Sequence, residues 1–180
     1  MYKRQGKTPH ENIQFLLVLA CILKAVDDHA DLLRWSAADV GNDHRLGANE
    51  APPAIISVFL GEQLDDVITQ LISTGSATHS LKGGVLQTGV ASLPDLAKDA
   101  TDRNRTSPFA FTGNRFEFRA VGSSDNCADA MITLNTAVAY QLKEFKADID
   151  KLIAEGHTKE NAIFTVLKRY TCLLYTSDAA

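Results

Sequence analysis

Features that mark several common protein classes are missing from this sequence. It has three cysteines, an odd number with no C-x-x-C pair, so neither a disulfide framework nor a zinc pattern is expected, and the reducing cytoplasm is the expected location. The apolar run at residues 13–26 is interrupted by Gln14 and Lys24, and it is too short and too amphipathic to cross a membrane. The first residues do not combine a charged region, an apolar core and a cleavage site, so no signal peptide is expected.

Basic residues are not in excess either. The formal net charge is -4 at pH 7, with 22% charged and 45% hydrophobic residues in a chain of 180. A negative balance argues against binding of nucleic acid or a membrane surface through bulk electrostatics. The length and composition suit one ordinary globular domain or a piece of one. No internal repeat, low-complexity segment or interdomain linker divides the chain.

The two ends of the chain are related to each other through their coding DNA. Back-translation of residues 1–5, read on the opposite strand in a shifted frame, yields the string Cys-Leu-Leu-Tyr-Thr found at residues 172–176. Such a pair resembles a library adapter translated together with its insert. We therefore expect residues 1–5 and 172–180 to be non-native, and residues 6–171 to be an internal fragment of a longer reading frame.

Apolar residues recur at helical spacing in four segments. The predicted helices cover residues 8–33, 53–73, 127–154 and 158–170. Thr8 and Glu11 have the spacing of a capping box at the start of the first helix. Between the helices, residues 35–40 are predicted to begin a short strand, residues 41–44 to form a turn, and residues 74–101 to form a long loop.

Residues 103–119 combine four arginines with one carboxylate in an otherwise apolar and small-residue stretch. Arg115, Glu117 and Arg119 alternate with phenylalanines, which predicts a strand with one charged and one aromatic face. Guanidinium groups bind phosphate and carboxylate in a bidentate way, so this composition suits an anion site. Ion-paired strand faces are also common on protein surfaces, and the residues alone leave both interpretations open. Because the arginines cluster in an acidic chain, a small anionic ligand is favoured over nucleic acid.

Long motifs then indicate a family. The sequence R-L-G-A-N-E-A-P-P at residues 45–53 and R-N-R-T-S-P-F-A-F-T-G-N-R-F-E-F-R at residues 103–119 resemble the C-terminal part of the catalytic domain of type III glutamine synthetase. The motifs H-E-N-I-Q-F, K-A-V-D-D-H-A-D-L-L-R, G-N-D-H-R-L and L-N-T-A-V-A agree, and the resemblance covers nearly all of residues 6–171. It implies an α+β fold dominated by helices, part of an incomplete barrel of strands flanked by long helices. It also implies a ring-shaped homo-oligomer with active sites between subunits.

The resemblance further implies a reaction: ATP-dependent ligation of ammonia to L-glutamate through a γ-glutamyl phosphate, with Mg²⁺ or Mn²⁺. L-glutamate, ammonium and ATP are the implied partners, without nucleic acid or membrane. Phosphoryl transfer between anions needs cationic groups, and ammonium needs a carboxylate to take its proton. The implied site residues are Arg45 for the glutamate carboxylate, Glu50 as the flap residue that accepts the ammonium proton, Arg105 for the ATP phosphates, Arg115 for the nucleotide, Glu117 for the metal and Arg119 for the substrate side-chain carboxylate or the phosphoryl group.

Two departures and two alternatives accompany this assignment. The spacing from Arg45 to Glu50 is one residue shorter than in the better-known bacterial type, and Ala110 stands where that type has a further arginine. A related carboxylate–amine ligase using another amine would share Glu117 and Arg119. A non-catalytic glutamine synthetase-like regulatory protein is the other alternative. The family's other metal ligands are expected upstream of the fragment, so the fragment alone is expected to be inactive.

Overall fold

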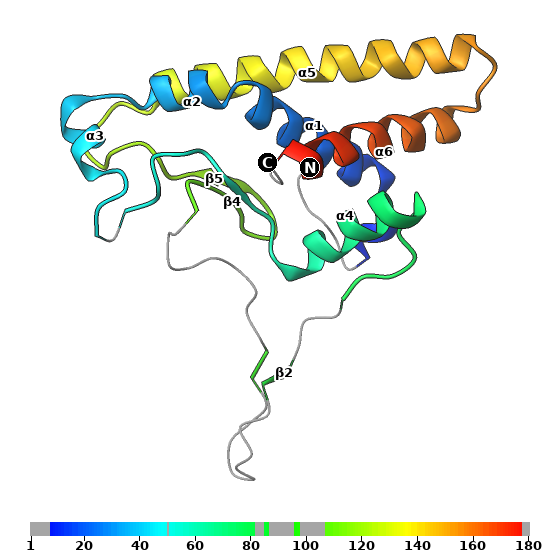
Figure 1. Ribbon diagram of the computed structural model, residues 1–180, viewed down its shortest axis with the longest axis horizontal. Helices are drawn as coiled ribbons and strands as arrows, with labels where there is room; N and C mark the ends of the chain where they lie inside the picture. Colours follow the sequence, from blue (N-terminus) through cyan, green and yellow to red (C-terminus); the bar gives the residue numbers. More distant parts are fainter. Residues whose placement is uncertain (1–7, 50, 82–84, 87–95, 98–106, 178–180) are drawn as a thin grey trace.

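The computed structural model describes residues 8–49, 51–81, 85–86, 96–97 and 107–177. Helices dominate it, and a small sheet lies beside them (Figure 1). The helices are η1 (Pro9–Glu11), α1 (Ile13–Asp28), α2 (Ala30–Ser36), α3 (Val40–Arg45), α4 (Glu62–Thr74), α5 (Ala128–Ala154) and α6 (Lys159–Ser177). The strands are β1 (Val58–Phe59), β2 (Val85–Leu86), β3 (Leu96–Ala97), β4 (Phe109–Phe111) and β5 (Phe116–Phe118). The predicted α+β class with helices dominant is confirmed.

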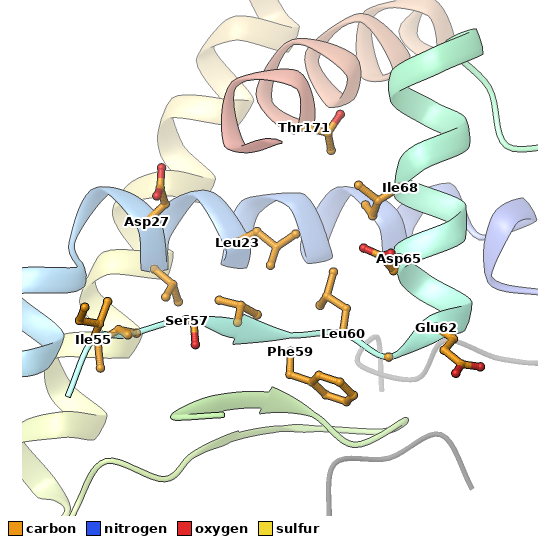
Figure 2. A pocket seen from close by; sticks show the side chains of 14 residues that line it. Leu23, Asp27, Ile55, Ser57, Phe59, Leu60, Glu62, Asp65, Ile68 and Thr171 are labelled. Carbon is orange, nitrogen blue, oxygen red and sulfur yellow. The ribbon is translucent and has the colours of Figure 1, made fainter. Parts of the chain in front are cut away.

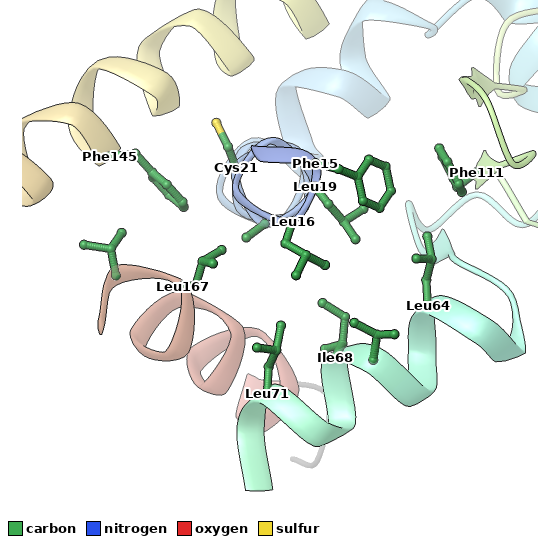
Figure 3. Packing of buried hydrophobic residues seen from close by; sticks show 13 residues of the cluster. Phe15, Leu16, Leu19, Cys21, Leu64, Ile68, Leu71, Phe111, Phe145 and Leu167 are labelled. Atoms are coloured by element: carbon green, nitrogen blue, oxygen red, sulfur yellow. The ribbon is translucent and has the colours of Figure 1, made fainter. Parts of the chain in front are cut away.

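Helix α1 lies at the centre of the packing. Its N-cap residue Asn12 accepts a hydrogen bond from the backbone N–H of Phe15 at 3.0 Å, which satisfies one of the free donors of the first turn. Buried side chains of α1 pack against α4, α5, α6 and Phe111 of β4 (Figure 3). Each large apolar side chain buried in this way stabilises the fold by roughly 1.5–3 kcal/mol relative to exposure.

The prediction of one helix over residues 8–33 is wrong, because the chain leaves the helical path twice. Thr8 makes no side-chain cap bond, so the predicted capping box does not form, and a 3₁₀ turn precedes α1. At His29 the backbone adopts φ -124° and ψ 26°, which separates α1 from α2. The break places fully buried Leu33 in a second apolar cluster with Phe109 of β4.

The short strand predicted for residues 35–40 and the turn predicted for residues 41–44 are also wrong. Helix α2 runs to Ser36, and α3 occupies Val40–Arg45. The side chain of Asp39 accepts the backbone N–H of Gly41 at 3.1 Å, so this polar sequence begins a helix rather than a turn.

The predicted helix over residues 53–73 forms only in its second half. Helix α4 begins after Gly61, whose φ of 84° is a conformation that favours glycine. The segment before it instead pairs with β4 as strand β1, and Ile55, which helical spacing places on the apolar face of the predicted helix, is 80% exposed. Of the apolar face predicted for this helix, Leu64, Val67, Ile68 and Leu71 are confirmed as buried. Ile56, Phe59 and Leu60 precede α4 and are half-buried.

The three-stranded sheet has the order β1-β4-β5, with β1 parallel and β5 antiparallel to β4. On β5, Phe116 and Phe118 turn toward the apolar clusters that involve α1. The ring of Phe116 stacks on that of Phe109 with centroids 5.1 Å apart. The predicted strand with an aromatic face is therefore confirmed, and its charged residues belong to the opposite face.

The C-terminal helices match the sequence prediction closely. Helix α5 begins one residue after the predicted start, and α6 begins at Lys159 but continues beyond the predicted end at residue 170. They pack together where Tyr170 stacks on Phe145, with ring centroids 4.5 Å apart. The Tyr170 hydroxyl also donates to the carboxylate of Asp148 at 2.6 Å.

Part of the predicted loop at residues 74–101 is regular. Strands β2 and β3 pair there in antiparallel fashion, with Val85 opposite Ala97 and Leu86 opposite Leu96.

Among the helices that the structure describes, none has both the length and the apolar character needed to cross a membrane.

Candidate active site

The charged face of β5 carries three of the residues predicted for the site. The Nη2 atom of Arg115 lies 3.0 Å from Oε1 of Glu117, and the Nη2 atom of Arg119 lies 3.0 Å from Oε2. One carboxylate is thus held between two guanidinium groups, as the alternating pattern predicts. The three side chains differ in exposure, at 70% for Arg115, 31% for Glu117 and 14% for Arg119. The Arg119 side chain is therefore mostly buried, whereas the Arg115 side chain is exposed to solvent.

The carboxylate of Glu117 stays charged in this setting. Its hydrogen bond with Arg119 lowers its pKa below the ordinary value, and the hydrogen bond with Arg115 acts in the same direction. Partial burial opposes this effect but does not reverse it. An ionised carboxylate is the form that binds Mg²⁺ or Mn²⁺, since these cations prefer hard oxygen ligands.

Ala110 lies directly opposite Glu117 in the antiparallel register between β4 and β5. Residues that face each other in such a pair project from the same side of the sheet. Ala110 is fully buried, so a methyl group occupies the position opposite Glu117. Among the described residues, the arginines paired with Glu117 are those that immediately precede and follow β5, Arg115 and Arg119.

Arg45, at the end of α3, reaches the end of β5. Its Nη2 atom donates to the backbone carbonyl of Ala120 at 2.9 Å and approaches that of Arg119 at 3.5 Å. Its Nε atom donates to Oδ1 of Asn42 at 2.9 Å. Arg45 and Arg119 were predicted from stretches more than seventy residues apart, and the structure brings them together.

Asn42 is a residue of this region that sequence reasoning missed. It is 3% exposed, and its amide nitrogen donates to the carbonyls of Ala37 at 2.6 Å and Ala120 at 2.7 Å. Burial of a polar group costs free energy unless the group is hydrogen-bonded. Both the nitrogen and the oxygen of this amide have hydrogen-bond partners. The local sequence Gly-Asn-Asp-His indicates only a turn, because the partner Ala120 lies 78 positions away.

Two predicted site residues, Glu50 and Arg105, lie outside the described residues, as does Arg103. Among the described residues, no group of three or more His, Cys, Asp or Glu side chains could hold a metal ion. Glu117 can therefore supply one oxygen-bearing ligand, and a complete divalent-metal site needs further ligands.

A cavity of about 630 Å³ lies elsewhere, between α1, β1, α4 and the end of α6 (Figure 2). Apolar side chains such as Leu23 and Phe59 line it, together with the carboxylates of Asp27, Glu62 and Asp65. Of the predicted site residues that the structure describes, none lines this cavity. The arginine–carboxylate face of β5 is thus a separate feature, and the class of protein is a helix-dominated α+β domain with arginines paired to a carboxylate along one strand.

Comparison with known proteins places this domain in a family, although no protein-family model matches the chain. It is 54% identical over 165 residues to glutamine synthetase of Bacteroides fragilis (strain YCH46), covering 91% of the chain and 23% of that protein. It is 55% identical over 144 residues to type-3 glutamine synthetase of Dictyostelium discoideum, covering 80% of the chain and 20% of that protein. Glutamine synthetase of Butyrivibrio fibrisolvens is 53% identical over 112 residues, or 62% of the chain and 16% of that protein.

The chain belongs to the glutamine synthetase family and is similar to a segment of each of these relatives, one of which is named as type-3. The resemblance inferred from the motifs is therefore confirmed. The chain spans 23% or less of the length of these relatives.

Proposed function

We propose that this chain is part of a glutamate–ammonia ligase, which joins ammonia to L-glutamate at the expense of ATP. The observation that carries the proposal is that Arg45 lies against the backbone carbonyl of Arg119, whose side chain pairs with Glu117, in a chain 54% identical over 165 residues to a glutamine synthetase. The described residues supply only part of such a site. The rest belongs to other parts of the complete polypeptide, and the fragment alone is inactive.

The reaction needs positive charge around the transferred phosphoryl group. A carboxylate is a poor electrophile, so ATP first converts the side chain of glutamate to a γ-glutamyl phosphate, and ammonia then displaces phosphate. Guanidinium groups stabilise the charge that develops on the phosphoryl oxygens. We assign this role to Arg119 and to Arg105, and a nucleotide contact to the exposed Arg115. Arg45 binds the carboxylate of substrate glutamate.

Two carboxylates complete the assignment. Glu117 is a ligand of the divalent metal, Mg²⁺ or Mn²⁺, and its lowered pKa keeps it in the charged form that this role requires. The metal, when bound, neutralises charge on the ATP phosphates. Glu50 takes the proton of ammonium and helps to close the site against water, which would hydrolyse the acyl phosphate.

We further propose where the complete enzyme acts and how it assembles. The complete protein is cytoplasmic and forms a ring-shaped homo-oligomer with active sites between subunits. Residues 1–5 and 172–180 are non-native adapter sequence, and residues 6–171 form the native fragment.

The proposal is tested in a complete polypeptide that carries this segment, such as the Bacteroides fragilis relative with its matching segment replaced by this chain. We expect it to form glutamine, ADP and phosphate in equal amounts from glutamate, ammonium and ATP. Glu50→Ala should abolish ammonia-dependent turnover while ATP binding persists, because only proton acceptance and closure are lost. Unchanged turnover would refute the flap assignment. Turnover with another amine in place of ammonium would favour a related ligase, and a folded protein without turnover would favour a non-catalytic role.

A further inference from the structure

We propose that Asn42 is a positioning residue for substrate glutamate, acting through Arg45. This inference rests on the proposed function, in which Arg45 binds the glutamate carboxylate. In this inference the buried side-chain amide of Asn42 on α3 fixes the orientation of the Arg45 guanidinium group.

The first step is the way Asn42 holds Arg45. Oδ1 of Asn42 accepts the Nε–H of Arg45 at 2.9 Å, and Nη2 of Arg45 donates to the carbonyl of Ala120 at 2.9 Å. Because a guanidinium group is planar, two bonds on one edge fix its plane. Nη1 of Arg45 makes no hydrogen bond to any described residue. This nitrogen can therefore donate to the carboxylate of the substrate.

The second step is the anchoring of Asn42 itself. Its amide nitrogen donates to the carbonyls of Ala37 and Ala120 at 2.6 and 2.7 Å. Ala37 precedes α3, and Ala120 follows Arg119 at the end of β5, so one side chain joins the two segments that carry the proposed substrate contacts. The Ala120 carbonyl accepts from Asn42 and Arg45 together. A shift of Asn42 would therefore move the Arg45 guanidinium and the Arg119 backbone at once.

Asn42 does more than support α3. The helix has its own cap in the exposed side chain of Asp39, which accepts the N–H of Gly41 at 3.1 Å. Among the described residues, the Asp39 side chain makes no hydrogen bond or ion pair with Arg45 or with β5. Loss of that cap weakens the helix, whereas loss of Asn42 also releases Arg45. Asp39→Ala is thus the matched control for a purely structural effect.

The experiment uses the complete polypeptide carrying this segment and measures KM for glutamate, KM for ATP, kcat and thermal unfolding. Asn42→Ala should raise KM for glutamate about tenfold, the effect of losing one hydrogen bond of ordinary strength, with KM for ATP changed less than about twofold. Asp39→Ala should lower the unfolding temperature without raising KM for glutamate. In an Arg45→Ala background, Asn42→Ala should change KM for glutamate less than about twofold, because the residue it positions is absent.

Should Asn42→Ala fail to fold, Asn42→Asp takes its place. Its carboxylate still accepts the Nε–H of Arg45 but cannot donate to the carbonyls of Ala37 and Ala120. The anchoring of residue 42 is then lost, so KM for glutamate should rise while KM for ATP changes less than about twofold. A rise in KM for glutamate that persists in the Arg45→Ala background, or an equal rise in Asp39→Ala, would overturn the inference alone. Absence of glutamine formation by the unmutated protein would overturn both the proposed function and this inference.

Discussion

Arg119 donates to a single oxygen of Glu117, Oε2, from both Nε and Nη2, at 3.2 and 3.0 Å. Arg115 binds the other oxygen, Oε1, from Nε at 3.1 Å. Both carboxylate oxygens are therefore already engaged by cations. A metal ion bound by Glu117 would share an oxygen with one of the guanidinium groups, so metal, nucleotide and arginine contacts should depend on one another.

Glu117→Gln in the complete polypeptide should weaken binding of Mn²⁺ and of the metal–ATP complex by at least about tenfold. The neutral amide keeps the shape of the side chain but is a much poorer ligand for a hard cation. Isothermal titration with Mn²⁺ measures the change. Asp150→Asn is the matched control, because Asp150 is an exposed carboxylate on α5 paired only with Lys146 among the described ion pairs, and it should leave affinity unchanged. Undiminished Mn²⁺ affinity in Glu117→Gln would remove the metal assignment.

The same substitution should reveal a pH-dependent contribution to stability. The pKa of Glu117 is lowered in the folded protein, so the unfolded state binds more protons at mildly acidic pH. The stabilisation is then fully present above the ordinary pKa of 4.5 and is lost as the pH falls through the lower folded value. Because Glu117 is partly exposed, the contribution should be at most about 1 kcal/mol.

Thermal unfolding of the wild type and of Glu117→Gln at about pH 7 and about pH 3 checks this direction. The wild type should be the more stable protein at the higher pH, and the difference should shrink at the lower one. A difference that grows on acidification would show that the arginines do not stabilise the charged carboxylate.

Cys21 should resist alkylation in the native protein. It is fully buried on α1, its Sγ lies 3.8 Å from the carbonyl of Val138, and burial raises its pKa to about 11. At about pH 8 the thiol is therefore protonated, and the protonated form is not the nucleophile. Mass spectrometry after iodoacetamide treatment should find Cys127, which is exposed, modified before Cys21. Guanidinium denaturation should make both react, and rapid native labelling of Cys21 would contradict the packing of α1.

The sequence predicted those parts of the fold that depend on local pattern. On β5 the signal was the alternation of phenylalanine with charged residues, and on α5 it was the recurrence of apolar residues every three or four positions. Both signals depend only on near neighbours in the sequence, and both elements formed as expected. Strand β1 was missed because its pairing partner, β4, lies about fifty residues away and because a short apolar run suits a helix equally well. Its apolar residues alone could not decide between these structures.

The candidate site divides in the same way. Arg115, Glu117 and Arg119 could be grouped from their spacing on one strand, and the pairing of Glu117 with both arginines followed from that spacing. Asn42 could not be found, because it binds a carbonyl 78 positions away in the sequence. The break at His29, which separates α1 from α2, is likewise not signalled by any proline or glycine next to it.

The central claim is that the charged face of β5 belongs to a phosphoryl-transfer site, and Arg119→Lys tests it most directly. Lysine keeps the charge but loses the planar fork that binds carboxylate and phosphate. Arg169→Lys, at an exposed arginine of α6 paired with Asp148, is the control. In the complete polypeptide, kcat for glutamine formation should fall at least about a hundredfold for Arg119→Lys and less than about twofold for Arg169→Lys, with both proteins folded. Equal kcat values for the two variants would contradict the account.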